Sequence, residues 1–139
     1  MTTLVRDVMT RAPLTIDPQA PVATAAAVMR ERGFRHLPVV EDDGRLVGMI
    51  SDRDIRSACL AAAVAEYLPE EARRRRQALE ALEETCVRHV MTWHVVTTHP
   101  QASVAQAAAE MLLAEVGSLA VVEHGRLVGI VTERDVLKA

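Results

Sequence analysis

The chain has 139 residues with a formal net charge of −3, and half of its residues are hydrophobic. This length predicts one compact domain or two small interlocked halves, and the composition is typical of a folded soluble protein. The slightly acidic balance and the presence of only three aromatic residues, Phe34, Tyr67 and Trp93, argue against general nucleic-acid binding and against base-stacking platforms.

The cysteines and the N-terminus give no sign of secretion. Cys59 and Cys86 are the only cysteines, and we interpret both as small, partly buried hydrophobic side chains in a reducing compartment. Residues 1–7 lack the basic and apolar regions of a signal peptide, and the longest uncharged apolar stretch, residues 57–65, is too short to span a bilayer. We therefore expect a cytoplasmic protein with no membrane partner.

The first predicted elements form a small mixed unit. A helical turn at residues 5–9 leads into an extended segment around residues 14–16. A helix follows, because Pro21 suits its first turn, apolar residues recur at helical spacing, and Gly33 offers a stop. Two apolar strands joined by a tight turn come next, at residues 37–40 and 45–50. Their nearly continuous apolar character predicts a sheet that is well covered.

A second helix begins where the later strand ends. Ser51 is followed three positions on by Asp54, which predicts an N-cap residue and an N3 carboxylate at the start of this helix. A helix start presents unpaired backbone N–H groups and the positive end of a dipole, and both favour phosphate.

The middle of the chain carries a helical insert. Residues 57–67 extend the preceding helix, and Pro69 with the glutamates after it predicts a fresh helix start. Four arginines at 73–76 point around that helix rather than along one face, and glutamates flank them. A solvated helix with internal ion pairs is therefore favoured over a nucleic-acid-binding surface.

The rest of the chain repeats the first part. Met9 corresponds to Met91, 82 positions on, and the spacing falls to 81 after the turn that precedes the later strand. The second copy predicts a helical turn at residues 87–91, an extended segment at 95–98, a helix from Ser103 to Gly117, and strands at 119–122 and 126–131. Thr132 and Asp135 repeat the helix start. The sequence thus divides into repeats at 1–56 and 85–139, separated by an insert at 57–84.

No catalytic or metal-binding constellation is present. The chain has no nucleophile elbow, no phosphate-binding glycine-rich loop with lysine, and no histidine pair at metal-binding helical spacing. Its five histidines are scattered, although we expect His36 and His94 to lie near a cleft between the repeats and within reach of an anion. We predict no catalytic residue, no metal site and no enzymatic activity.

Two copies of a strand ending in glycine, two apolar residues and Ser/Thr-x-x-Asp, each preceded by Val-Met-Thr, resemble a tandem pair of CBS domains. The resemblance covers residues 3–55 and 85–136. It implies an α+β fold in which two β-α-β-β-α repeats pack sheet to sheet with pseudo-two-fold symmetry. It also implies a homodimer that binds AMP, ADP or ATP, with S-adenosylmethionine as a further candidate, in clefts between the repeats.

Within that frame the residues receive expected roles. Asp54 and Asp135 are able to accept hydrogen bonds from ribose hydroxyls, while Ser51 and Thr132 sit where a phosphate would bind. Adenine would lie between apolar walls, and we expect each Asp to face the adenine-contacting segments of the opposite repeat. The expected ligand contacts are Thr10, Thr15, His36, Leu37, Pro38, Ser51, Arg53, Asp54, Thr92, Val95, Thr97, Leu119, Ala120, Thr132, Arg134 and Asp135.

Two functional hypotheses remain open from the sequence. The first is a stand-alone regulatory module that senses an adenine nucleotide and signals in trans to an unidentified effector protein. The alternative is a ligand-free structural or interaction module with vestigial clefts, because Ser-x-x-Asp is also a capping box worth about 1 kcal/mol without any ligand. Asp52 and Glu133 place negative charge beside the phosphate position, which favours AMP over ATP or requires a cation.

Overall fold

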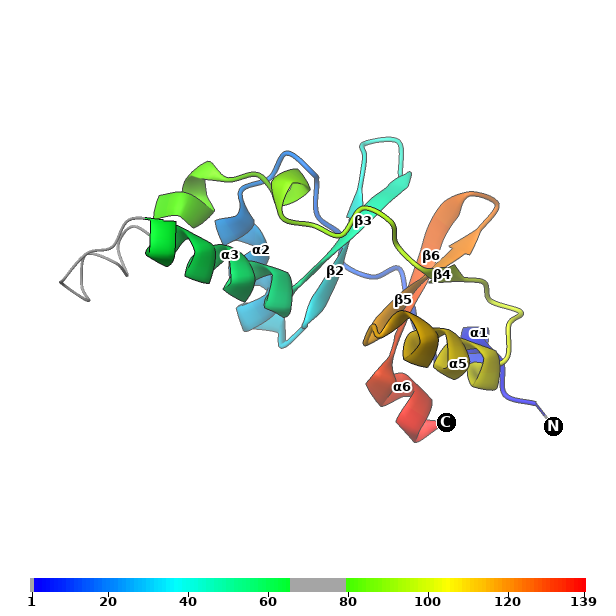
Figure 1. The fold of residues 1–139 in the computed structure, drawn as a ribbon. Coiled ribbons are helices and arrows are strands. Elements are labelled where there is room, and N and C mark those ends of the chain that lie inside the picture. Colours follow the sequence, from blue (N-terminus) through cyan, green and yellow to red (C-terminus); the bar gives the residue numbers. More distant parts are fainter. Residues whose placement is uncertain (1, 66–79) are drawn as a thin grey trace.

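The structure is a computed structural model that describes residues 2–65 and 80–139, and Figure 1 shows two β-hairpins side by side with helices on either side. The predicted helix start at Pro69 and the arginines at 73–76 lie outside the described residues. Residues 80–84 are helical. The elements, in chain order, are α1 (Val5–Val8), β1 (Thr10–Arg11), α2 (Val22–Arg32), β2 (His36–Val40), β3 (Leu46–Ser51), α3 (Asp52–Ala65), η1 (Val87–His89), β4 (Thr97–Thr98), α5 (Val104–Ala114), β5 (Ser118–Glu123), β6 (Arg126–Thr132) and α6 (Glu133–Lys138).

The two predicted hairpins are confirmed. In the first half of the molecule β2 and β3 pair antiparallel, with His36 opposite Ser51, and α2 and α3 pack beside them. In the second half β5 and β6 pair antiparallel, with Ser118 opposite Thr132, and α5 and α6 pack beside them. The two helix starts therefore lie at the same end of their hairpins, opposite the turns.

The segment that leads into each half pairs with the other half. Strand β1 precedes the first half in sequence, yet it joins β6 in a sheet of order β1-β6-β5-β4. In the same way Thr92 bridges to Met49 in β3. The helical turns follow this exchange, because the Val5 N–H donates to the Ala102 carbonyl and the Val87 N–H donates to the Ala20 carbonyl, both at 2.8 Å. The two halves are thus interlocked through both leading segments.

Two glycines make this exchange possible. A Cβ atom on Gly48 would lie 2.5 Å from the Met91 sulfur and 2.9 Å from the Thr92 carbonyl oxygen. A Cβ atom on Gly129 would lie 2.7 Å from the Met9 sulfur and 2.9 Å from the Thr10 carbonyl oxygen. Glycine in each strand therefore lets the exchanged segment approach the backbone closely.

The hydrophobic core reflects the same exchange. The core of the first half contains Val87 and Met91 from the leading segment of the second half. The core of the second half contains Val5 from the start of the chain. Val5 and Val87 are fully buried, so each contributes about 2 kcal/mol to the free energy of unfolding. A third cluster, centred on Met49, Ala120 and Ile130, joins the two hairpins.

The helix ends match the sequence predictions with one exception. Gly33 has a φ of +70° and ends α2, as predicted. The prediction that the corresponding helix continues to Gly117 was wrong, because α5 ends at Ala114 and Glu115 takes the left-handed conformation with a φ of +56°. A Cβ atom on Gly117 would lie 2.9 Å from a carboxylate oxygen at the tip of the exposed Glu133 side chain. None of the described helices is both long and apolar enough to cross a bilayer.

Candidate functional site

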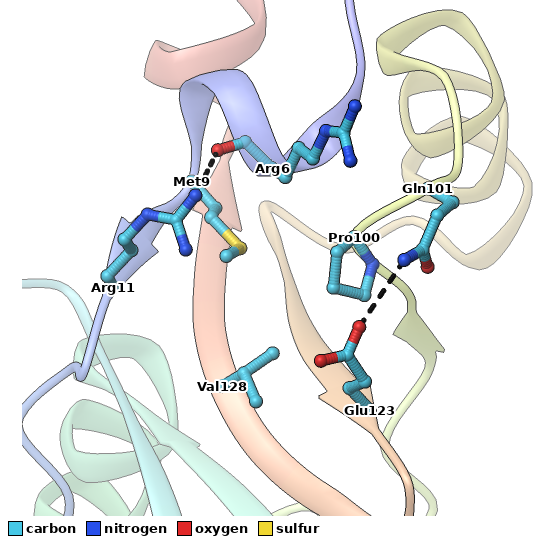
Figure 2. A pocket seen from close by; sticks show the side chains of 7 residues that line it. All are labelled: Arg6, Met9, Arg11, Pro100, Gln101, Glu123 and Val128. Carbon is cyan, nitrogen blue, oxygen red and sulfur yellow. Dashed lines mark hydrogen bonds between the residues drawn. The ribbon is translucent and has the colours of Figure 1, made fainter.

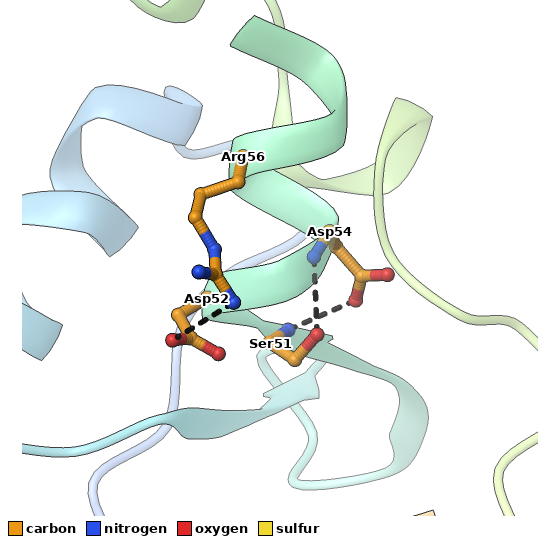
Figure 3. Close-up of polar contacts among 4 residues, drawn as sticks. All are labelled: Ser51, Asp52, Asp54 and Arg56. Atoms are coloured by element: carbon orange, nitrogen blue, oxygen red, sulfur yellow. Dashed lines mark hydrogen bonds and ion pairs between the residues drawn. The ribbon is translucent and has the colours of Figure 1, made fainter. Parts of the chain in front are cut away.

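The predicted capping motif of the first half is complete. The Ser51 N–H donates to Asp54 Oδ2 at 2.9 Å, and the Asp54 N–H donates back to Ser51 Oγ at 3.1 Å. Figure 3 shows this reciprocal pair at the start of α3, beside an ion pair of 3.7 Å between Asp52 and Arg56. Both capping side chains are half-buried. The motif therefore stabilises the helix start without any ligand.

The second half repeats this arrangement at the start of α6. The Thr132 N–H donates to Asp135 Oδ2 at 2.8 Å, and the Thr132 hydroxyl donates to the same oxygen at 3.1 Å. The Asp135 N–H lies 3.4 Å from the Thr132 hydroxyl oxygen, which it contacts as a longer hydrogen bond. The two carboxylates are thus held alike by their own helices.

The capping bonds change what each carboxylate can offer to a ligand. In Asp54 and Asp135 the hydrogen bonds to protein all use Oδ2, and no donor among the described residues contacts Oδ1. Because both side chains are half-buried rather than enclosed, Oδ1 can accept a hydrogen bond from outside the protein. Each Asp therefore presents one fixed acceptor oxygen.

His36 lies where the two halves meet. Its Cα pairs with that of Ser51, and its ring carbon Cε1 lies 3.5 Å from the point where a Cβ atom on Gly117 would be. A carboxylate oxygen of Glu133, at the start of α6, lies 2.9 Å from that same point. His36 from the first half and Glu133 from the second therefore flank Gly117, near both helix starts.

Burial sets the protonation of this histidine. Desolvation lowers the pKa of the His36 imidazole below its ordinary value. The negative charges of Asp52, Glu133 and Asp54 raise this pKa, and the positive charge of Arg35 lowers it, but burial has the largest effect. The imidazole is therefore mostly neutral at pH 7, with a ring that can both donate and accept a hydrogen bond.

The other predicted contacts separate into core and surface residues. Leu37, Pro38, Leu119 and Ala120 are buried in the strands, so a ligand would meet their backbone rather than their side chains. Val95 packs against the cluster that joins the hairpins. The remaining predicted contacts are exposed, and they are Thr10, Thr15, Arg53, Thr92, Thr97 and Arg134.

The structure connects the leading segments to both hairpins. Thr10 lies opposite Ile130 in β6, and Ile16, six residues on, bridges to Val39 in β2. The copy follows the same path, because Thr92 bridges to Met49 and Thr97 lies opposite Ala120. Each predicted adenine-contacting segment therefore crosses from one half to the other.

The sequence analysis expected each Asp to face a segment of the opposite repeat, but it did not predict the strand pairing by which these segments cross. Each Val-Met-Thr segment has its own glycine partner in the opposite repeat, and these glycines recur with the spacing of the repeat. The described residues contain no group of three or more His, Cys, Asp or Glu side chains that is arranged to hold a metal ion.

A β-hairpin unit that occurs twice, with exchanged leading segments and a capped helix start in each half, defines a tandem-repeat architecture. The family profile described as the CBS domain matches residues 5–61 and 87–139, and the chain belongs to the CBS domain family.

Similar sequences occur alone and inside longer proteins. The chain is 35% identical over 138 residues to a CBS domain-containing protein of Dictyostelium discoideum, covering 99% of this chain and 90% of that protein. It is 28% identical over 135 residues to L-aspartate semialdehyde sulfurtransferase of Methanocaldococcus jannaschii, covering 96% of this chain. In that enzyme, however, the match spans only 22% of the length.

A solved structure supplies a ligand-bound comparison. The chain is similar to the CBS domain pair of protein MJ0100 in complex with 5′-methylthioadenosine and S-adenosyl-L-methionine, with a TM-score of 0.79 and 27% identity. The match covers 99% of this chain and 95% of that one. The predicted α+β fold, with two CBS repeats packed through their sheets, is confirmed.

Proposed function

We propose that this CBS pair is a regulatory module, not an enzyme, that binds an adenosyl ligand between its two halves. The observation that carries the proposal is the presence, in both halves, of a half-buried Asp whose Oδ2 is held at the helix start and whose Oδ1 has no hydrogen-bond donor among the described residues. The similar CBS pair of protein MJ0100, which binds two adenosyl compounds, supports this class of ligand.

Different residues contact different parts of the ligand. Oδ1 of Asp54 or Asp135 accepts a hydrogen bond from a ribose hydroxyl, which is a charge-assisted and therefore strong contact. Backbone groups of the strand starts at 37–38 and 119–120 contact the adenine edge, together with the crossing segments at 10–15 and 92–97. Arg53 and Arg134, which are exposed, reach a phosphate where the ligand carries one.

Signalling follows from the crossing segments. A ligand that touches a segment shared by both halves stabilises one relative position of those halves more than another. The output would act in trans on an effector protein in the cytoplasm, which is the compartment that the sequence predicts.

A second copy of the chain is a further expected partner. Leu112 and Leu113 on α5 and Leu137 on α6 are 80%, 87% and 85% exposed, and these two helices pack against each other. Three large apolar side chains on adjoining helices favour an apolar contact, which supports the predicted homodimer. Light scattering of the L113D/L137D double variant should give the mass of a monomer where the original chain gives a dimer.

Calorimetric titration tests the ligand class. AMP, ADP, ATP, S-adenosylmethionine and 5′-methylthioadenosine are each titrated into the protein, and at least one should bind. Trp93, the only tryptophan, lies 58% exposed in a crossing segment and provides a second, fluorescent readout. Absence of binding by all five compounds would contradict the proposal.

One observation favours the alternative of a ligand-free interaction module. Both capping boxes are complete without a ligand, so neither Asp requires one for its stability. That alternative predicts no shift of the unfolding temperature with any adenosyl compound, together with an unchanged dimer.

A further inference from the structure

A separate pocket lies between α1 and the β5–β6 hairpin, and Figure 2 shows it from close by. Its volume is about 340 Å³, which lies in the range of small-molecule sites. Glu123 in this pocket is the last residue of β5, whereas Thr132 is the last residue of β6, so the pocket and the capped helix start occupy opposite ends of the hairpin. The residues that line the pocket are Arg6, Met9, Arg11, Pro100, Gln101, Glu123 and Val128.

The floor of the pocket is apolar and well supported. Pro100 is buried, and Met9 and Val128 are half-buried. Met9 is fixed there because its sulfur packs against Gly129, where a Cβ atom would lie only 2.7 Å away. The Arg6 N–H donates to the Pro100 carbonyl at 3.0 Å and ties α1 to the far wall.

The walls carry opposite charges. Arg6 and Arg11 come from the leading segment, and Arg11 Nη2 donates to the Arg6 carbonyl at 3.3 Å, which holds its guanidinium beside α1. On the other side Gln101 Nε2 donates to Glu123 Oε2 at 3.4 Å. Within residues 2–65 and 80–139 neither arginine forms an ion pair with Glu123. Positive and negative groups are therefore separated across an apolar floor.

We propose that this pocket binds a small zwitterion, an α-amino acid with an apolar side chain. Its carboxylate would pair with the Arg11 guanidinium, which matches a carboxylate in geometry and charge, while Arg6 adds a second positive charge to the lining. Its ammonium group would bind Glu123, and its side chain would cover Met9 and Val128. A simple anion would instead be repelled by Glu123, which favours the zwitterion.

The internal repeat supports a selected arrangement of these side chains. At the corresponding positions around the β2–β3 hairpin the same residue types recur, namely Arg88, Met91, Pro18, Gln19, Glu41 and Val47. The backbone contact also recurs, because the Arg88 N–H donates to the Pro18 carbonyl at 2.9 Å. Arg6, Arg88, Gln19 and Gln101 are exposed, so core packing does not require their recurrence.

One position distinguishes the two copies. Trp93 is the counterpart of Arg11 in the other repeat, so only the pocket beside Arg11 has two arginines in its lining. The Arg11 guanidinium has no counterpart beside Trp93, which assigns the tighter site to the pocket beside Arg11.

Matched ligands test the proposal. L-leucine is titrated into the full chain and followed by the methyl NMR signals of Met9 and Val128, beside isocaproate, which lacks the ammonium group, and isoamylamine, which lacks the carboxylate. Leucine should bind at millimolar concentration, and each partial analogue should bind about tenfold more weakly, because it loses one charge-assisted contact. Failure of leucine to bind, or equal binding of isocaproate, would overturn the proposal.

Variants locate the site and its polarity. R11Q and E123Q should each weaken leucine binding about tenfold. For isocaproate, R11Q should weaken binding while E123Q should strengthen it, because a repelling charge is removed. The matched controls R45Q and D42N change the same charges in the β2–β3 turn and should leave leucine binding unchanged. An unaltered leucine affinity in both R11Q and E123Q would also contradict the proposal.

Discussion

The two halves of the molecule share one plan at the centre and differ at the periphery. Both have a Ser or Thr cap with an Asp at N3, a strand glycine, and a leading segment from the opposite half. Outside this centre, α3 has 14 residues and buries Ile55, whereas α6 has six residues and buries none. The shared features surround the junction, which is where the ligand is proposed to bind.

The second half also carries more polar groups in its interior. Buried Thr98 stands where the first half has Ile16, and Glu110 stands where it has Val28. The Thr98 hydroxyl oxygen and one Glu110 carboxylate oxygen are buried without a hydrogen-bond partner among the described residues. The two halves therefore differ in the polarity of their interiors, although their caps and strand glycines are alike.

The largest expected effect comes from the strand glycines. G48A and G129A should each lower the free energy of unfolding by about 2–3 kcal/mol, because the added methyl group would overlap a carbonyl oxygen of the exchanged segment. Chemical denaturation measures both variants. Similar losses would confirm that the halves dock alike, whereas a loss in only one variant would break the comparison.

Removing the helix caps should lower the stability of the two halves by different amounts. S51A should cost about 1 kcal/mol of stability, because α3 contributes to the core of the first half. T132A should cost less in global unfolding, because α6 buries no residue and its loss of the cap frays only that short helix. Hydrogen exchange combined with denaturation distinguishes the two results. An equal loss of global stability in both variants would contradict this reading of α6.

Removing the buried hydroxyl group of Thr98 should make the protein more stable. T98V should raise the free energy of unfolding by up to about 1 kcal/mol, because it removes a buried polar group that has no partner among the described residues. T97V, on the exposed neighbour in the same strand, is the matched control and should change stability little. A loss of stability in T98V would show that the hydroxyl is satisfied.

The smallest effect concerns pH. Since burial lowers the folded-state pKa of His36, protonation favours the unfolded chain, and the stabilisation is complete above the unfolded value of about 6.5. This stabilisation is lost as the pH falls from the unfolded-state pKa through the folded-state pKa of His36. Relative to H36S, which installs the residue type found at position 118, the original chain should lose stability on acidification. The opposite slope would mean that Asp52, Asp54 and Glu133 outweigh burial.

The sequence predicted local structure well. The hairpins, the stop at Gly33, and the caps at Ser51 and Thr132 all follow from short-range patterns, and the repeat supplied the hairpins and the caps twice. These features depend on residues a few positions apart, and the residue types at those positions predict the local backbone conformation and its hydrogen bonds.

The long-range contacts were harder to predict. No short-range sequence pattern indicates that Met9 packs on Gly129 rather than on Gly48, because both glycines occupy the same position in their strand motifs. The early end of α5 was missed because a non-glycine residue, Glu115, takes the left-handed conformation that ends this helix. The predicted ligand contacts stay predictions until a complex is observed.

The most direct test of the central claim is a crystal structure with the adenosyl compound that binds most tightly in the titrations. The proposed function predicts a ribose hydroxyl about 3 Å from Oδ1 of Asp54 or Asp135, with the adenine against a segment that crosses between the halves. A ligand seated elsewhere, with both Asp residues touching only their own helices, would contradict it.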